Sequence, residues 1–383
     1  MKVKKCGSRP SRTTCLATLL LSAGLSAVNG QSGLWTKMPG RGNFLAASKA
    51  GVWAYDGGSK AVYKWNEATG AWAVTALGDC FPITADDRGN VWGVSGGKVL
   101  ELTAGAAVPK DTAASGVDWA SVDPATGSLY ALDTNKIIWQ RAAGSAAWQK
   151  FTTLPSGVNA RQITANPGGG VWMTARQSPG AWQCVTPNCT PSLIGGLNST
   201  TATVADVVRT SGGWFAVYGN FLRSSFGAGK SIPLGSAAAE MVNPTHVAFE
   251  NGPGGARLWM MTQTGFIWRV PIPPATQIAQ EYTTAADNLK STMGKITDAG
   301  SAQINAPDLD TLLGPYLLAK RNAQFWMLLE ANSQADVSAA ASAVKAAEDA
   351  LEAARKSLLT GPYSASVAPY FTNLRAEYRP LAE

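Results

Sequence analysis

The chain has 383 residues, of which 45% are hydrophobic and only 15% charged, and it is rich in glycine (40) and tryptophan (14). This composition excludes an intrinsically disordered chain, which is poor in aromatic residues and carries a high net charge. The formal charge of +7 is misleading, because the first 30 residues hold five basic and no acidic residues and the remainder carries 7 − 5 = +2. A nearly neutral chain gives no electrostatic reason to expect nucleic acid as a partner.

The five basic residues of the N-terminus precede an uncharged apolar run from Cys15 to Ala27, and small residues follow. This order is typical of a secretory signal peptide over residues 1–30, cleaved near Gly30. The apolar run is too short to span a bilayer, so we expect no membrane span and a secreted or periplasmic mature chain. The other interpretation of this segment is a disordered basic tail.

A unit of short strands and glycine-rich turns recurs along the first two thirds of the chain. Its copies are about 38 to 45 residues apart, which is the period of a four-stranded propeller blade. The apolar or aromatic pairs at their centres are Val52-Trp53, Val91-Trp92, Leu129-Tyr130, Val171-Trp172, Trp214-Phe215 and Leu258-Trp259. The strands of each unit are half-buried, so each unit needs neighbouring units to cover its faces. We therefore predict an all-β six-bladed β-propeller over residues 31–272.

The sixth unit stops at Pro271, after its third strand. A spare strand at residues 33–38, around Trp35, precedes the first complete unit. We expect this N-terminal strand to become the fourth strand of the last blade, which closes the ring and removes an unpaired edge.

The composition changes at residues 273–383, where alanine and leucine rise and apolar residues recur at helical spacing, which predicts a C-terminal all-α helical bundle. One stripe repeats every seven residues and alternates with alanine. Its large members are Val337, Val344, Leu351 and Leu358. Such a stripe either packs inside the bundle or joins several chains into a homo-oligomer.

Three cysteines remain after the leader: Cys80, Cys184 and Cys189. Export permits a disulfide, and Cys184 and Cys189 flank a turn-like segment, so we predict a bond between them. Cys80 is left as a buried thiol or as one half of an intermolecular bridge. With one histidine and no Cys-x-x-Cys spacing, we expect no zinc site, and no motif calls for a cofactor.

The repeated Gly-x-Val-Trp-Gly-Val segment, followed by a turn and a Val/Ile-Tyr/Leu-x-Trp strand, resembles tectonin repeats. The best matches are Gly89 to Leu102 and Gly51 to Trp72, and the resemblance covers about residues 33–272. Tectonin-type proteins, tachylectin-like ones among them, are β-propellers that often act as lectins. The resemblance implies a secreted, non-catalytic carbohydrate-binding protein that recognises cell-surface or microbial glycans.

Two sets of residues are candidates for glycan contact. The strand tryptophans Trp53, Trp92, Trp172 and Trp259 occur once per blade, and they either pack between blades or stack on sugars. The loops after the second strands open on one face of the ring and carry side chains with several donors or acceptors, which are otherwise solvated turn residues. These loop candidates are Asp56, Ser95, Asp133, Arg176, Asn220 and Gln263.

Two other functions are compatible with a propeller. A protein–protein interaction scaffold needs an exposed apolar patch on the ring or the helices. A propeller lactonase or lyase needs a convergent carboxylate or histidine cluster in the central channel, and such a cluster would have to come from Asp86, Asp123 and Asp206. The single histidine, His246, forms no catalytic relay by itself. No Gly-x-Ser-x-Gly elbow, phosphate loop or dinucleotide fingerprint is present, so we expect no enzymatic activity.

Overall fold

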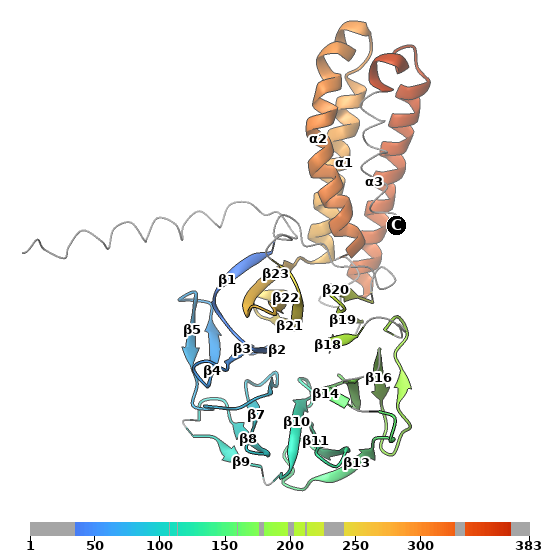
Figure 1. Cartoon of the computed structure of the whole chain (residues 1–383). Coiled ribbons are helices and arrows are strands. Elements are labelled where there is room, and N and C mark those ends of the chain that lie inside the picture. The colour runs from blue at the N-terminus through green and yellow to red at the C-terminus, as the bar shows by residue number, and fades with distance from the viewer. Residues whose placement is uncertain are drawn as a thin grey trace, which may run out of the picture. The chain divides into compact units, whose positions relative to one another are not determined.

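The computed structural model describes residues 35–106, 108–112, 114–158, 160–175, 180–197, 203–210, 213–225, 241–325 and 334–368. The leader predicted for residues 1–30 and the candidate Arg176 lie outside these ranges. Six antiparallel sheets are arranged around a common centre, and three helices follow them in the chain (Figure 1). The six-bladed β-propeller with a C-terminal helical region is therefore confirmed. None of the described helices combines the length and the apolar character needed to cross a membrane.

Each blade begins with its innermost strand. The strands of the first three blades are β2 (Phe44–Ser48), β3 (Gly51–Asp56), β4 (Ala61–Asn66), β5 (Ala71–Val74); β6 (Ile83–Ala85), β7 (Val91–Ser95), β8 (Lys98–Leu102), β9 (Lys110–Asp111); and β10 (Val117–Val122), β11 (Leu129–Asp133), β12 (Ile137–Arg141), β13 (Gln149–Thr153). Those of the last three are β14 (Ala160–Ala165), β15 (Val171–Ala175), β16 (Ala181–Cys184), β17 (Ser192–Leu193); β18 (Val204–Arg209), β19 (Trp214–Tyr218), β20 (Phe221–Ser224); and β21 (Pro244–Gly252), β22 (Gly255–Thr262), β23 (Phe266–Ile272).

The last sheet is built from both ends of the propeller sequence. Its order is β1-β23-β22-β21, where β1 (Thr36–Arg41) is the first strand of the chain. β1 and β23 are antiparallel, with Thr36 opposite Arg269 and Lys37 opposite Trp268. The N-terminal strand thus covers an edge of β23 that would otherwise present unpaired backbone groups.

Aromatic side chains of the second strands fill the space between the blades. Trp53, Trp92, Trp172 and Trp259 are at most 4% exposed. Neighbouring inner strands are joined by hydrogen bonds as well: Val122 N donates to Thr84 Oγ1 at 3.0 Å, and Ala165 N donates to Ser121 Oγ at 2.8 Å. The strand tryptophans therefore pack between blades and leave no face for a sugar.

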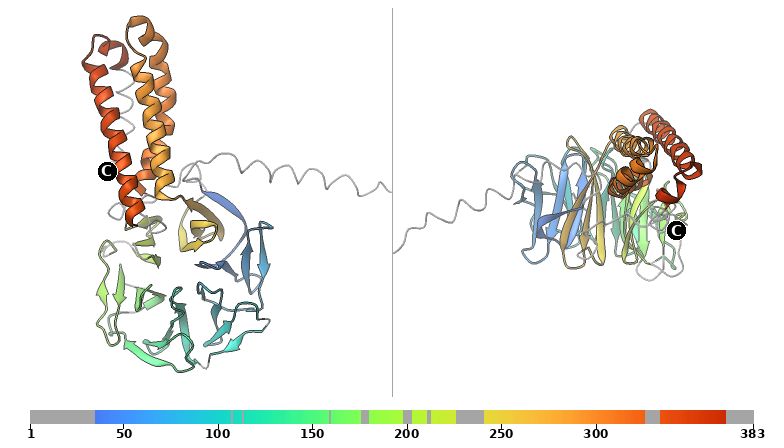
Figure 2. Two further views of the ribbon diagram at one scale, coloured as in Figure 1. Left: turned by 180° about the vertical axis from the view of Figure 1, so that it is seen from behind. Right: turned by 90° about the horizontal axis from the view of Figure 1, so that it is seen from above.

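The helical region consists of α1 (Ala275–Gly294), α2 (Ala299–Phe325) and α3 (Gln334–Thr360), and residues 364–368 are also helical. α1 contacts both α2 and α3, and the three helices run side by side (Figure 2). Leu351 of α3 is 7% exposed and belongs to the same hydrophobic cluster as Tyr282 and Leu289 of α1. The seven-residue stripe of α3 thus packs inside its own chain.

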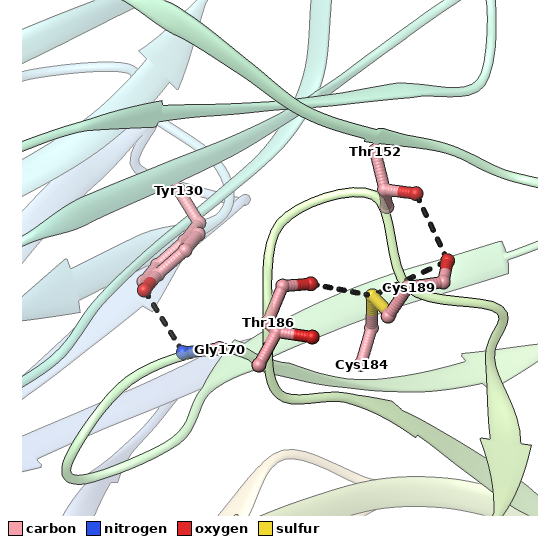
Figure 3. The surroundings of a disulfide bond; sticks show 6 residues. All are labelled: Tyr130, Thr152, Gly170, Cys184, Thr186 and Cys189. Atoms are coloured by element: carbon pink, nitrogen blue, oxygen red, sulfur yellow. Dashed lines mark hydrogen bonds between the residues drawn. A yellow bond between two sulfur atoms is a disulfide. The ribbon is translucent and has the colours of Figure 1, made fainter.

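The predicted disulfide between Cys184 and Cys189 is present, with the two Cα atoms 5.7 Å apart (Figure 3). It closes the connection from β16 to β17. The Thr152 hydroxyl of the preceding blade donates to the Cys189 carbonyl at 3.2 Å, which ties this connection to β13. Cys80 is a free, buried thiol.

Candidate functional site

Four of the predicted loop candidates occupy ordinary turn positions. Asp56 closes its own turn by accepting from Gly58 N and Ser59 N at 3.1 and 3.2 Å, and the Ser59 hydroxyl bonded to its carboxylate lowers the pKa of that carboxyl. Ser95 ends β7. Asn220 lies in the short turn between β19 and β20, and Gln263 N donates to the Asn243 carbonyl at 2.8 Å.

Asp133 lies in a different environment, because it lines a pocket of about 340 Å³ beside the third blade. The walls of the pocket come from β11, β12, the start of β13 and the connection from β9 to β10. Its lining residues are Ala114, Ser115, Val117, Ala131, Asp133, Asn135, Trp139 and Trp148. We call this site the Trp139–Trp148 pocket. Its volume is in the lower part of the range usual for small-molecule sites.

Asp133 both closes a turn and orients an indole. Its Oδ1 accepts from Asn135 N and Ile137 N, each at 2.8 Å, which shapes the hairpin between β11 and β12. Its Oδ2 accepts from Trp139 Nε1 at 2.9 Å. The Trp139 ring is therefore held in one position at the pocket wall before any ligand arrives.

Trp148 is fixed from another side. Its Nε1 donates to the Thr112 carbonyl at 3.0 Å, at the end of the second blade. The Arg141 guanidinium lies 5.7 Å from its ring centroid and is paired with Glu101 at 2.8 Å. Both indoles are thus pre-oriented, so that little side-chain entropy is lost when a ligand contacts them.

Besides Asp133, whose carboxylate is engaged, the pocket has two polar side chains that are free to bind. Ser115 and Asn135 are exposed, and neither side chain has a hydrogen-bond partner within the described chain. A hydroxyl and an amide supply donors and acceptors together. Two oriented indoles beside such groups suit a ligand with an apolar face and several hydroxyls.

At the first blade the equivalent indole packs against two other indoles. Trp72, like Trp148, donates its Nε1 to a carbonyl of the preceding blade's outer strand, here Pro39 at 2.8 Å. Its ring, however, packs against Trp65 and Trp259, with centroids 5.3 and 6.2 Å away. Neither Trp139 nor Trp148 was among the binding residues predicted from sequence; both follow the Asp133 turn along the chain, and that proximity was the available signal.

The aspartates considered for catalysis do not meet. Asp86 and Asp123 follow the inner strands β6 and β10, where they accept from turn amides such as Arg88 N and Ala125 N, each at 3.0 Å. Asp206 is near the beginning of β18, at the other end of the inner strands. Within the described ranges, no group of three or more His, Cys, Asp or Glu side chains is placed to hold a metal ion.

Comparisons with known proteins give only distant likenesses. The chain is 14% identical to a structural-genomics protein of unknown function from Bacteroides thetaiotaomicron, with a TM-score of 0.46 over 61% of this chain and 70% of that one. It is 14% identical to the calcium-binding protein regucalcin from Agrobacterium tumefaciens, with a TM-score of 0.43 over 61% of this chain and 90% of that one. It is 12% identical to a catalytically inactive virginiamycin B lyase from Staphylococcus aureus, with a TM-score of 0.40 over 62% of this chain and 83% of that one. No protein-family model and no curated protein matches the chain.

Proposed function

We propose that this protein is a secreted, non-catalytic lectin of the tectonin type, and that the Trp139–Trp148 pocket holds a sugar ring of a glycan. The observation that carries the proposal is the pocket itself, with two fixed indoles beside Asp133 and Asn135. The C–H face of a sugar packs on an aromatic ring, and its hydroxyls pair with amide, hydroxyl and carboxylate groups. The tectonin-like repeats, the leader-like N-terminus and the disulfide support the same function.

The size of the pocket sets the expected affinity. A monosaccharide has about twelve heavy atoms, and about 0.3 kcal/mol per atom gives about 4 kcal/mol, which corresponds to a dissociation constant of about 1 mM. Binding to one site is therefore to be measured by NMR or tryptophan fluorescence at millimolar sugar. A glycan array identifies the sugar first.

The test compares two tryptophans that make the same bond between blades. In the mature chain, Trp148→Leu removes a wall of the pocket, whereas Trp72→Leu removes the equivalent side chain at the first blade, which does not line the pocket. We expect Trp148→Leu to weaken sugar binding at least tenfold and Trp72→Leu to leave it within twofold. Asn135→Ala removes a polar contact without touching either indole, and we expect it to weaken binding about threefold to tenfold.

Two results would overturn the proposal. Equal losses in both tryptophan variants would mean that the effect is one of stability and not of the pocket. Binding of the wild-type chain to no microbial or host glycan would favour the interaction scaffold instead.

A further inference from the structure

One residue per blade lies at the same level of the inner strand, at one mouth of the central channel. Each is opposite the residue three positions after the first member of the blade's central pair, as Phe44 is opposite Tyr55. The other register pairs are Trp119 with Leu132, Gln162 with Thr174, Asp206 with Val217 and His246 with Met261. In the second blade the corresponding residue is Pro82, whose carbonyl accepts from Val94 N at 3.1 Å. We call these six residues the mouth ring; it is apolar on blades one to three and polar on blades four to six.

The polar half of the mouth ring is organised by Asp206. Its Oδ1 accepts from Gln162 Nε2 at 2.6 Å and from Val207 N at 2.8 Å. Its Oδ2 accepts from Val247 N at 3.0 Å and lies 3.3 Å from His246 Nδ1. The carboxylate is thus saturated, and its role is to orient its neighbours: the Gln162 amide nitrogen faces Asp206, and His246 Nδ1 carries a proton because a carboxylate only accepts. In the neutral form of such an imidazole, Nε2 is a hydrogen-bond acceptor.

This arrangement leaves two hydrogen-bond acceptors. Gln162 Oε1 and His246 Nε2 have no partner within the described chain, and the two residues are 2% and 9% exposed. The side chains of His246 and Asp206 are only 11% and 8% exposed. A buried negative charge beside two free acceptors favours a ligand that is positively charged and donates several hydrogen bonds.

The apolar half of the mouth ring supplies aromatic faces. The Phe44 ring has its centroid 4.5 Å from that of His246 and 5.5 Å from that of Trp119. Phe81, on the loop before β6, packs against Phe44 at 5.6 Å and Trp119 at 5.9 Å, and it remains 44% exposed. Elsewhere lysine and arginine cover aromatic rings, as Lys64 covers Trp53 at 4.9 Å, but no described basic side chain covers Phe44, Phe81 or Trp119.

The size of the channel limits what can enter it. The cavity along the inner strands, which Phe44, Trp119, Gln162 and Asp206 line, measures about 90 Å³. That is room for an ammonium head group, and it is well below the several hundred Å³ usual for a site that encloses a small molecule such as a sugar ring.

We propose that the channel mouth is a second binding site, separate from the Trp139–Trp148 pocket, for a compact primary ammonium ligand. The ammonium donates to Gln162 Oε1 and His246 Nε2, and the charge of Asp206 favours the cation. The stem of the ligand lies against Phe81 and Trp119, whose rings attract a cation and bury apolar surface.

The single histidine of the chain makes a direct test feasible, because its imidazole ¹⁵N resonances need no assignment in the tag-free mature protein. Phenethylammonium chloride is titrated into the labelled protein. We expect the Nε2 resonance to shift saturably while Nδ1 stays protonated. The neutral analogue 2-phenylethanol and tetramethylammonium, which has no N–H donor, are expected to bind at least tenfold more weakly. Absence of a saturable shift, or an equal shift with the alcohol, would refute the proposal.

A pair of exposed phenylalanines provides the matched variants. Phe81→Ala removes the stem contact and is expected to weaken phenethylammonium binding about fivefold. Phe221→Ala removes a phenylalanine that is 54% exposed on β20, outside this aromatic cluster, and is expected to leave binding unchanged. Equal effects of the two variants would contradict the site. Neither residue lines the sugar pocket, so failure of the lectin proposal does not affect this test.

Discussion

At the scale of single residues, packing inside the propeller determines the reactivity of the Cys80 thiol. Its side chain is buried, its Sγ lies 3.1 Å from the Leu77 carbonyl, and its Cβ occupies the place that a side chain on Gly93 would need. Burial, and after it the negative charge of Asp79, raises the pKa of the Cys80 thiol to about 11. Both causes favour the neutral thiol, which does not react as a nucleophile.

We therefore predict that Cys80 is unreactive in the native protein. At pH 8 a thiol of pKa 11 is about one-thousandth ionised, against about one quarter for an ordinary cysteine of pKa 8.5. A disulfide reagent such as Ellman's should release one equivalent per unreduced mature chain only after unfolding in guanidinium chloride, since Cys184 and Cys189 are bonded. Rapid release from the folded chain would contradict the burial of this thiol.

From the sequence it follows that the loop candidates share one face of the ring, but not which of them line a pocket. Antiparallel pairing places the end of every second strand on the same face of the ring, which follows from the repeat alone. A pocket at Asp133 depends on how the neighbouring side chains pack, and the equivalent indole of Trp72 packs against Trp65 and Trp259. Strand spacing carries no information about such side-chain packing.

The mouth ring was beyond sequence reasoning for a different physical reason. Gln162, Asp206 and His246 each follow a register irregularity at the start of an inner strand. Bulges re-aim the following side chain, and a hydrophobic pattern does not reveal where they occur. The sequence analysis therefore considered Asp206 with Asp86 and Asp123, although its partners in the structure are Gln162 and His246.

At the scale of elements, the first and last blades are joined by two kinds of contact. Trp72 of β5 donates to the Pro39 carbonyl of β1 at 2.8 Å. Glu67 pairs with Arg269 of β23 at 2.7 Å, but the Glu67 side chain is 52% exposed. A well-exposed ion pair contributes little to stability. Removing the indole of the half-buried Trp72 costs more, because its hydrogen bond is lost together with ring contacts to Trp65 and Trp259.

We predict that Trp72→Phe lowers the free energy of unfolding by about 1 kcal/mol, and that Glu67→Gln lowers it by less than about 0.5 kcal/mol. Urea unfolding followed by circular dichroism measures both. Trp148→Phe removes the equivalent bond between the second and third blades and serves as the control, with an expected loss similar to that of Trp72→Phe. A larger loss for Glu67→Gln than for Trp72→Phe would mean that charge, and not the indole bond, holds the closure.

At the scale of the whole molecule, the ring could be foreseen because the six units and the incomplete last one leave few arrangements without an open edge. Whether the seven-residue stripe of α3 packs within one chain or between chains could not be predicted from the sequence. A seven-residue repeat of large residues and alanine serves an oligomer and an intramolecular bundle equally well. The structure places Leu351 in one cluster with Tyr282 and Leu289 of α1, so this surface is already covered within one chain.

We therefore predict that the full mature chain is a monomer that presents one Trp139–Trp148 pocket. Sedimentation equilibrium over a hundredfold range of protein concentration should give the mass of a single chain. Ile304 of α2, which is 73% exposed, is the strongest apolar alternative contact on the described helices, and Ile304→Lys should leave the mass unchanged. A dimer that persists in Ile304→Lys would show that the helices associate through another face. For a monomer, no gain in avidity is available, and the affinity for a surface glycan stays near that of the single pocket.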